Sequence, residues 1–367
     1  MKRSLVLIFC SFYIQLSGSL PETMVIAQPI VNLRSKPEKR DSSLATVIYE
    51  HDDPLHKCQL LLGERVLVTQ EVDDWYQVQV LDQKVYDLEK SVWRCDSGWI
   101  EKQQAVGMSV PVDTSCVIVC QPWANVFEEP HIESRQVMRL SLGSKLRAFK
   151  FNEVWWVVVL PDARVGMIQA GDVYESTREV LENVEQLRAN ILETAKKFLG
   201  VPFCRYGRSF HDPHMLTGMS CCGLVSLAYR AHGLDIPFYV YDQYKSGVPV
   251  NGDQLKPGDL IMFARFKERY DPCHVVMYVG NDMLLEVTWS RAPFPYRARL
   301  ISAKDRISPQ LLKTMKDGQR LERFYVYFRS YLASSWWVQQ LRNASRKGIF
   351  SYLEATETSM MPSSRAC

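Results

Sequence analysis

Apolar and polar residues alternate through most of the first half of the chain. The runs "WYQVQVL" at 75–81 and "WWVVVL" at 155–160 show the pattern clearly, and each run begins twelve residues after a glycine, Gly63 or Gly143. Such alternation is typical of strands with one buried face. The first half of the chain is therefore predicted to be all-β.

The strand-like runs belong to an internal repeat. The segment "NLRSKP" at 32–37 has a counterpart, "NVFEEP", at 125–130, and each copy closes on a Gly-x-Ile unit. Short strands in a repeated order predict two small antiparallel barrels, over residues 25–105 and 114–175. The order of their elements resembles that of bacterial SH3-like domains.

The hydrophobic spacing then changes to a helical period. Ser176 and Glu179 form a capping-box pattern, apolar residues follow at helical spacing to Phe198, and Gly200 ends the run. Beyond it we expect one buried helix and three strands, in "GLVSLAYRAHG", "LKPGDLIMF", "HVVMYVGN" and "MLLEVTW". This order predicts an α+β domain over 176–333, followed by a partly disordered tail over 334–367.

The beginning of the chain predicts export. Lys2 and Arg3 precede an apolar run and then small residues, which indicates a signal peptide over residues 1–19; an uncleaved anchor is the alternative. After cleavage no membrane span is expected. The 44 basic and 41 acidic residues nearly balance, so no nucleic-acid partner is indicated.

Ten cysteines are scattered along the 367 residues, and Cys10 lies in the predicted signal peptide. The remaining nine are an odd number without CxxC spacing, which argues against a disulfide scaffold and a structural zinc site. At least one thiol should be free. The adjacent Cys221 and Cys222 precede the predicted buried helix, whose N-terminus favours a thiolate. Packing, a disulfide, metal ligation and a nucleophile remain open for this pair.

A base for such a nucleophile is best supplied by His274, which begins a predicted strand. If the next hairpin has a three-residue loop, Val279 faces Met283, and Glu286 shares a sheet face with His274. A carboxylate there would orient the imidazole. A two-residue loop would turn Glu286 to the opposite face, and Thr288 is then the fallback.

These residues resemble the NlpC family of papain-like peptidoglycan cysteine peptidases. The likeness rests on "CCGLV", "LKPGDLIMF", "HVVMYVGN" and "MLLEV" and covers about residues 185–330. It implies a papain-like catalytic domain of the NlpC type, with Cys221 as nucleophile and Cys222 at the family's usual serine. The backbone N–H of Cys221 would help to hold the oxyanion. The third catalytic position is Glu286, where histidine is commonest.

Two barrels before such a domain are similar to the subgroup that cleaves the bond between γ-D-glutamate and a diamino acid. In that subgroup a glutamate of a "QLLYGE"-like motif helps to bind a free N-terminal L-Ala amine. The motif is "CQLLLGE" here, so the resemblance assigns Glu64 to that role. A solvated loop carboxylate is the simpler reading of Glu64.

Several positions depart from the family pattern. Ser220 stands where an aspartate usually precedes the nucleophile, and "PFCRYGRS" replaces P-Y-x-W-G-G-R-S. Phe203 and Arg205 thereby replace a tyrosine and a tryptophan, while Tyr206 offers a phenol from a new position. Further candidates for substrate contact are Arg208, which suits a carboxylate, and Asp242, in a segment similar to one that borders the family cleft.

The sequence as a whole predicts an exported peptidase that acts on peptidoglycan stem peptides, in the periplasm or cell envelope of a bacterium. Cys221 would attack the carbonyl carbon, His274 would transfer the proton, and Glu286 would orient His274. No metal or organic cofactor is expected. Two alternatives remain at this stage. One is a catalytically decayed wall-binding module, and the other is an acyltransferase or amidase with the same Cys–His site.

Overall fold

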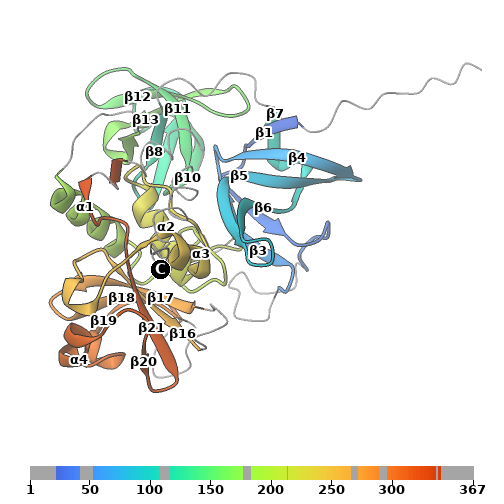
Figure 1. The fold of residues 1–367 in the computed structure, drawn as a ribbon. Coiled ribbons are helices and arrows are strands. Elements are labelled where there is room, and N and C mark those ends of the chain that lie inside the picture. The colour runs from blue at the N-terminus through green and yellow to red at the C-terminus, as the bar shows by residue number, and fades with distance from the viewer. Residues whose placement is uncertain are drawn as a thin grey trace, which may run out of the picture.

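The computed structural model describes residues 22–41, 53–107, 116–176, 183–212, 214–265, 272–288, 296–335 and 338–339. The predicted signal peptide and most of the predicted tail lie outside the described residues. The chain forms two all-β units and a third unit of helices and one sheet (Figure 1). Helix α2 lies where the three units meet.

The first β unit contains one sheet, in the order β3-β2-β6-β5-β4-β1-β7. Part of its burial follows the alternation in the sequence, as in β5, where Val78 and Val80 are buried and Gln79 between them is exposed. Its strands are β1 (Glu22–Ile26), β2 (Ile30–Arg34), β3 (His56–Leu61), β4 (Arg65–Val72), β5 (Trp75–Asp87), β6 (Val92–Glu101) and β7 (Ala105–Gly107), with the 3₁₀ helix η1 (Lys102–Gln104) before β7.

The second β unit repeats the first. Its sheet order is β10-β9-β13-β12-β11-β8-β14, which is the order of the first sheet shifted by seven strands. The strands are β8 (Cys116–Val119), β9 (Trp123–Phe127), β10 (Gln136–Ser141), β11 (Lys145–Lys150), β12 (Trp155–Val159), β13 (Val165–Gln169) and β14 (Val173–Glu175), with η2 (Ala170–Asp172) before β14. The sequence repeat is therefore a structural repeat. That the two units are SH3-like domains stays a prediction.

The equivalent glycines of the two repeats occupy turns at the junction of the units. Gly63 has φ +87° and Gly143 has φ +90°, a conformation that side-chain-bearing residues rarely adopt. A Cβ on Gly63 would lie 1.9 Å from the backbone oxygen of Lys145, and one on Gly143 would lie 2.6 Å from Cδ2 of Leu227. Both turns need glycine because another unit approaches them closely.

The third unit carries a sheet in the order β15-β21-β16-β17-β18-β19, and β20 pairs with β21. Its helices are α1 (Val184–Lys196), α2 (Cys221–Arg230), α3 (Val240–Ser246) and α4 (Pro309–Thr314). Its strands are β15 (Val248–Pro249), β16 (Leu260–Ala264), β17 (Pro272–Gly280), β18 (Met283–Val287), β19 (Ala298–Ser302), β20 (Gln319–Leu321) and β21 (Phe324–Ser330), and the 3₁₀ helices are η3 (Gly252–Gln254) and η4 (Ala303–Asp305).

Helix α1 starts later than the capping-box pattern predicted. Its N-cap is Asn183, whose side-chain oxygen accepts the backbone N–H of Glu185 at 3.0 Å. An asparagine that satisfies a first-turn donor is a strong start signal in its own right. Glu179 of the predicted box lies outside the described residues.

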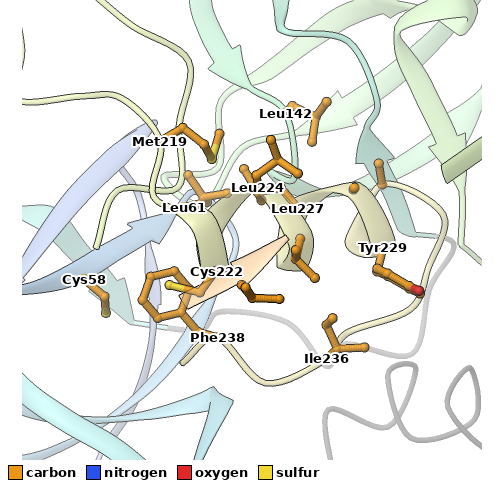
Figure 2. Packing of buried hydrophobic residues seen from close by; sticks show 14 of the residues in the cluster. Cys58, Leu61, Leu142, Met219, Cys222, Leu224, Leu227, Tyr229, Ile236 and Phe238 are labelled. Atoms are coloured by element: carbon orange, nitrogen blue, oxygen red, sulfur yellow. The ribbon is translucent and has the colours of Figure 1, made fainter. Parts of the chain in front are cut away.

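A single hydrophobic cluster joins the first β unit to α2 and the sheet of the third unit. Leu61 of β3 and Leu142 of the second β unit lie against Leu224 and Leu227 of α2 (Figure 2). All four side chains are buried. Helix α2 is thus held by apolar contacts from both β units, so its N-terminus has a fixed position.

Candidate active site

Cys221 is the first residue of α2. The preceding Ser220 is the N-cap, and its Oγ accepts the backbone N–H of Gly223 at 3.1 Å while donating to the carbonyl of Gly207 at 2.9 Å. The cap fixes the first turn, where the helix dipole favours a negative charge. Ser220 is itself buried at 4% exposure, so its observed role is to position the start of α2.

The hairpin of β17 and β18 brings His274 and Glu286 together. Nε2 of His274 lies 2.9 Å from Oε1 of Glu286, and this leaves Nδ1 for the thiol of Cys221. The hairpin loop has two residues rather than three, because Gly280 pairs with Met283. A β-bulge between Tyr278 and Gly280 restores the register, so Met277 faces Leu285 and Glu286 keeps the face of His274.

Arg299 and Arg306 complete the surroundings of Glu286, and the sequence analysis did not identify either of them. Nη2 of Arg299, directly across from Glu286 on β19, donates to Oε2 at 2.9 Å. Arg306 donates Nε and Nη2 to the two carboxylate oxygens at 2.9 Å each. In the sequence, the basic residues after β18 were the only sign of these two partners. Residues 289–295 separate them from β18, so no local pattern indicated that they pair with Glu286.

Cys221 and Cys222 differ sharply in acidity. The hydrogen bond from the thiol of Cys222 is the main cause that lowers the pKa of Cys221 well below its usual value; burial opposes this effect, and His274 lowers the pKa further. The same hydrogen bond, together with burial, raises the pKa of Cys222. Cys222 is buried at 4% exposure, whereas Cys221 keeps some exposed surface. Cys221 is therefore the more acidic thiol of the pair.

The pKa of His274 is raised to about 9. Burial works against its charged form, but the interactions with Cys221 and Glu286 outweigh burial. Burial also disfavours the charged form of Glu286 and so raises its pKa, yet the contacts with His274 and the two arginines lower this pKa to about 2. These pKa shifts favour a thiolate at Cys221, an imidazolium at His274 and a carboxylate at Glu286, an arrangement suited to nucleophilic attack on a carbonyl carbon.

The loop before α2 contains three residues that were predicted to contact the substrate, and they differ in exposure. Phe203 is buried at 6% exposure in the hydrophobic cluster. Tyr206 has φ +56°, a strained conformation, and the guanidinium of Arg205 lies 5.0 Å from its ring centroid. The Tyr206 ring also meets Tyr239 edge-on at 5.9 Å. Of the three residues, Arg205 and Tyr206 keep exposed surface with which to meet a ligand, and Phe203 does not.

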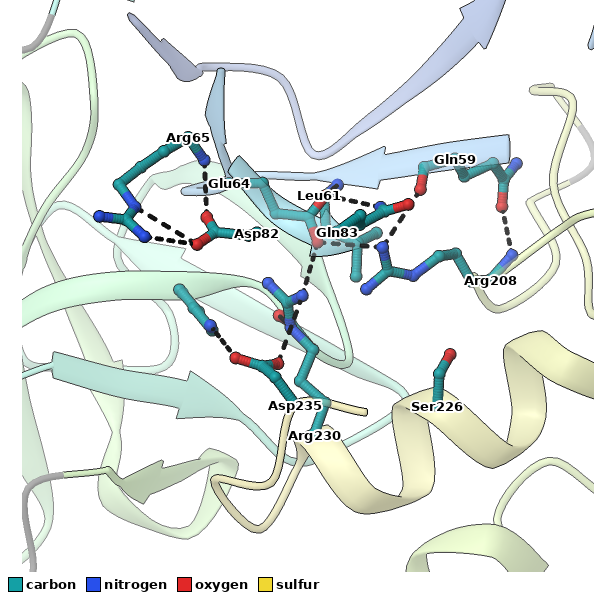
Figure 3. Close-up of polar contacts among 12 residues, drawn as sticks. Gln59, Leu61, Glu64, Arg65, Asp82, Gln83, Arg208, Ser226, Arg230 and Asp235 are labelled. Carbon is teal, nitrogen blue, oxygen red and sulfur yellow. Dashed lines mark hydrogen bonds and ion pairs between the residues drawn. The ribbon is translucent and has the colours of Figure 1, made fainter. Parts of the chain in front are cut away.

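Glu64 lies in a buried charge network between the units (Figure 3). Its Oε1 is 2.5 Å from Nη1 of Arg230 and 3.0 Å from Nη1 of Arg208, while Oε2 accepts the backbone N–H of Leu61. The Glu64 side chain is 0% exposed and that of Arg208 is 3% exposed. The structure therefore argues against direct substrate contact by either residue, because each is enclosed by the other and by the surrounding units.

Asp242 also contacts another unit. It lies in the first turn of α3 at 3% exposure, and its Oδ1 accepts the backbone N–H of Tyr86 on β5 at 2.9 Å. Burial raises its pKa to about 7 and the charge of Asp96 adds to this, although the hydrogen bond from Tyr86 opposes it. Its observed contact is with the first β unit.

Three further observations concern the described residues alone. They contain no group of three or more His, Cys, Asp or Glu side chains that could hold a metal ion. No disulfide joins any two of the eight cysteines in this part of the chain. None of its helices is both long enough and apolar enough to cross a membrane.

Comparison with known proteins finds similar peptidases. A gamma-D-glutamyl-L-lysine dipeptidyl-peptidase of Bacillus cereus is 28% identical over 232 residues, which cover 62% of this chain and 66% of that protein, just under two thirds. The protein of the same name from Bacillus subtilis is 28% identical over 274 residues, 72% of this chain and 82% of the relative. Both relatives are named as peptidases.

Two further matches concern the NlpC/P60 family. Residues 200–294 match the NlpC/P60 family. The crystal structure of an NlpC/P60 family protein from Bacillus cereus superimposes with a TM-score of 0.65 at 21% identity, covering 85% of this chain and all of that one. The residues that match the NlpC/P60 family include Cys221, His274 and Glu286, and the fold of the chain is similar to that of the Bacillus cereus protein.

Proposed function

We propose that the protein is a cysteine peptidase that hydrolyses the amide bond between γ-D-glutamate and diaminopimelate in peptidoglycan stem peptides. The observation that carries the proposal is the juxtaposition of Cys221, at a helix N-terminus, with His274, whose other ring nitrogen is held by Glu286. The names of the relatives from the two Bacillus species support the γ-D-glutamyl side of the bond.

In the first half of the reaction the thiolate Sγ of Cys221 attacks the γ-carbonyl carbon of D-glutamate. A carbon–sulfur bond forms, and the carbonyl oxygen becomes an oxyanion beside the backbone N–H groups of the first turn of α2. The carbon–nitrogen bond then breaks, and the leaving amine takes the proton from Nδ1 of His274. The γ-D-glutamyl group remains on Cys221 as a thioester.

In the second half neutral His274 accepts a proton from water, and the hydroxide attacks the thioester carbonyl. The carbon–sulfur bond breaks, which releases the γ-carboxylic acid and regenerates the thiolate–imidazolium pair; the acid then loses its proton to solvent. Glu286 keeps its contact with Nε2 throughout and fixes the ring orientation. No step uses a metal or an organic cofactor.

The substrate has a free N-terminal L-Ala, so the enzyme trims peptide ends. The relatives' description as dipeptidyl-peptidases supports this part of the proposal, although Glu64 would not touch the amine. The enzyme acts after export, in the periplasm or cell envelope of a bacterium. The two β units, which we interpret as SH3-like barrels, restrict access to Cys221 from the side of the first β unit.

Mass spectrometry tests the reaction directly. L-Ala-γ-D-Glu-diaminopimelate is incubated with the purified chain, with Cys221→Ala and with Cys95→Ala, which removes a partly exposed cysteine from the first β unit. The parent chain and Cys95→Ala should both release L-Ala-γ-D-Glu, and Cys221→Ala should release none. The N-acetylated peptide should be cleaved more slowly than the free amine.

Two results would contradict the proposal. Release of L-Ala-γ-D-Glu by Cys221→Ala would exclude Cys221 as the nucleophile. If the parent chain cleaves neither this peptide nor longer stem peptides while Cys221 is still alkylated rapidly at neutral pH, the site is intact and the substrate is wrong.

A further inference from the structure

Three neighbouring strands carry a row of ionisable side chains that begins at His274, the partner of Cys221. His274 lies on β17, Glu286 on β18 and Arg299 on β19, and Glu286 and Arg299 are direct cross-strand partners. Arg306 joins the row from the end of η4. The row connects the nucleophile to the far edge of the sheet through ion pairs.

The carboxylate of Glu286 is fully enclosed by donors. Oε1 is met by Nε2 of His274 and Nε of Arg306, and Oε2 by the Nη2 atoms of Arg299 and Arg306, all at 2.9 Å. The Glu286 side chain is 0% exposed. Four donors and no solvent contact leave the carboxylate one orientation, and bidentate contacts from Arg306 fix its plane.

The two arginines also influence the charge of His274. A buried carboxylate with one imidazole neighbour would be costly to ionise, and it would bind the imidazolium proton tightly once ionised. Arg299 and Arg306 carry permanent positive charges that stabilise the carboxylate and repel a further positive charge on His274. They thereby hold Glu286 ionised while weakening its attraction for the proton that His274 must deliver to the leaving amine.

We propose that Arg299 and Arg306 are positioning residues that act through Glu286 to set the pH range in which Cys221 is a thiolate beside a protonated His274. This inference rests on the proposed function only in assigning the two arginines to the same Cys–His reaction. Neither arginine needs to touch the substrate.

Other described groups around His274 do not replace this effect. Helix α2 presents Cys221 and Cys222, Cys273 is the chain neighbour, and β16 presents the uncharged ring of Phe263 at 6.2 Å. Helix α3 also packs against β17 and carries titratable residues, which make contacts with residues of β5 and β21: Tyr241, Asp242, Tyr244 and Lys245. Within the described part of the chain, the cations paired with Glu286 besides His274 are Arg299 and Arg306.

The test measures the ion pair without any peptide substrate. The rate of iodoacetamide alkylation at Cys221 is followed by peptide mass spectrometry from pH 4 to 10, and the upper inflection of the profile marks loss of the His274 proton. Arg306→Gln and Arg299→Gln should each move this inflection upward by about 0.5 pH unit or more, because one repelling charge is lost. Glu286→Gln should move it downward.

Two control variants separate charge from packing. Arg306→Lys keeps the charge but loses the bidentate contact, so its inflection should stay at the parent value while the maximal rate falls. Arg320→Gln, on β20, removes an arginine whose side chain donates to the backbone oxygen of Glu322, and its profile should match that of the parent. Circular dichroism and melting curves establish that each variant is folded.

The outcomes are distinguishable. Unshifted inflections in folded Arg306→Gln and Arg299→Gln would overturn the inference, and so would equal shifts in Arg306→Lys and Arg306→Gln. If Arg306→Gln does not fold, Arg299→Gln, which leaves the bidentate pair in place, decides the matter alone. Shifted inflections in a chain that cleaves no stem peptide would uphold the role of the arginines and reject the proposed substrate.

Discussion

Replacing Glu64 with glutamine separates a structural role from a substrate-binding role at this position. The change keeps the size of the side chain and removes its charge. Arg230 and Arg208, each 3% exposed, then lose the carboxylate that lies 2.5 and 3.0 Å from them. Arg230 keeps a weaker contact with Asp235 at 3.6 Å and donates to the backbone oxygen of Gly143.

The expected loss of stability follows from burial. Removing one partner of a buried ion pair typically costs about 3–5 kcal/mol, because the remaining charge stays desolvated. At about 2 °C or more per kcal/mol, the melting temperature should fall by about 6 °C or more. Glu71→Gln, in an exposed pair with Lys102 on the same β unit, is the matched control and should cost less than about 1 kcal/mol.

Differential scanning fluorimetry and cleavage kinetics measured together test this reasoning. Glu64→Gln should melt early, and Glu64→Gln/Arg208→Met should recover part of the loss because one unpaired charge is gone. The KM for L-Ala-γ-D-Glu-diaminopimelate should change little at temperatures where the variant is folded. An unchanged melting temperature with a KM raised at least about tenfold would refute the argument and make Glu64 a substrate ligand.

Three other substitutions have defined outcomes. Cys222→Ser keeps a donor beside Cys221, so the rate of iodoacetamide alkylation at Cys221 should stay within about fivefold of the parent, and complete loss would contradict this. Burial raises the pKa of Asp242 from 3.8 to about 7, so the ionised form destabilises the fold; the penalty is absent below pH 3.8, grows as pH rises to 7 and is complete above it. Asp242→Asn should therefore raise the free energy of unfolding in urea by up to about 4 kcal/mol at pH 8 and hardly at pH 4, and a pH-independent gain would reject this reading. Gly143→Ala combines φ +90° with a close contact to α2 and should cost about 1–3 kcal/mol, whereas Gly171→Ala, which meets nothing within 4 Å, should be near neutral by the same urea measurement.

Local patterns in the sequence were sufficient for much of the fold. Alternation and the repeated glycine-to-tryptophan spacing predicted two equivalent β units, and the two sheets have the same strand order. The helix that begins at Cys221 and the strand that carries His274 were also predicted, and both are present. These features depend on contacts between residues close in sequence, which periodicity records directly.

The hairpin shows where such reasoning fails. A two-residue loop was expected to turn Glu286 to the opposite face. Asn281 and Asp282 do form a two-residue turn, with positive φ values of 50° and 53°, but Gly280 forms an adjoining bulge with φ +89°. The turn and the bulge together shift the pairing as the longer loop would have done. Glu286 is on the predicted face because of this bulge, which the alternation of apolar residues does not predict.

Glu64 and Glu286 show why matching a motif does not assign a role. Both are fully buried glutamates paired with two arginines, and both match positions at which the resemblance implies function. Glu64 takes its arginines from another unit, and its two oxygens accept hydrogen bonds from Leu61, Gln83 and Arg230. Glu286 takes Arg299 and Arg306 from later in its own sheet unit and still presents Oε1 to His274. The difference arises from segments distant in the sequence, so it becomes visible only when those segments are brought together by the fold.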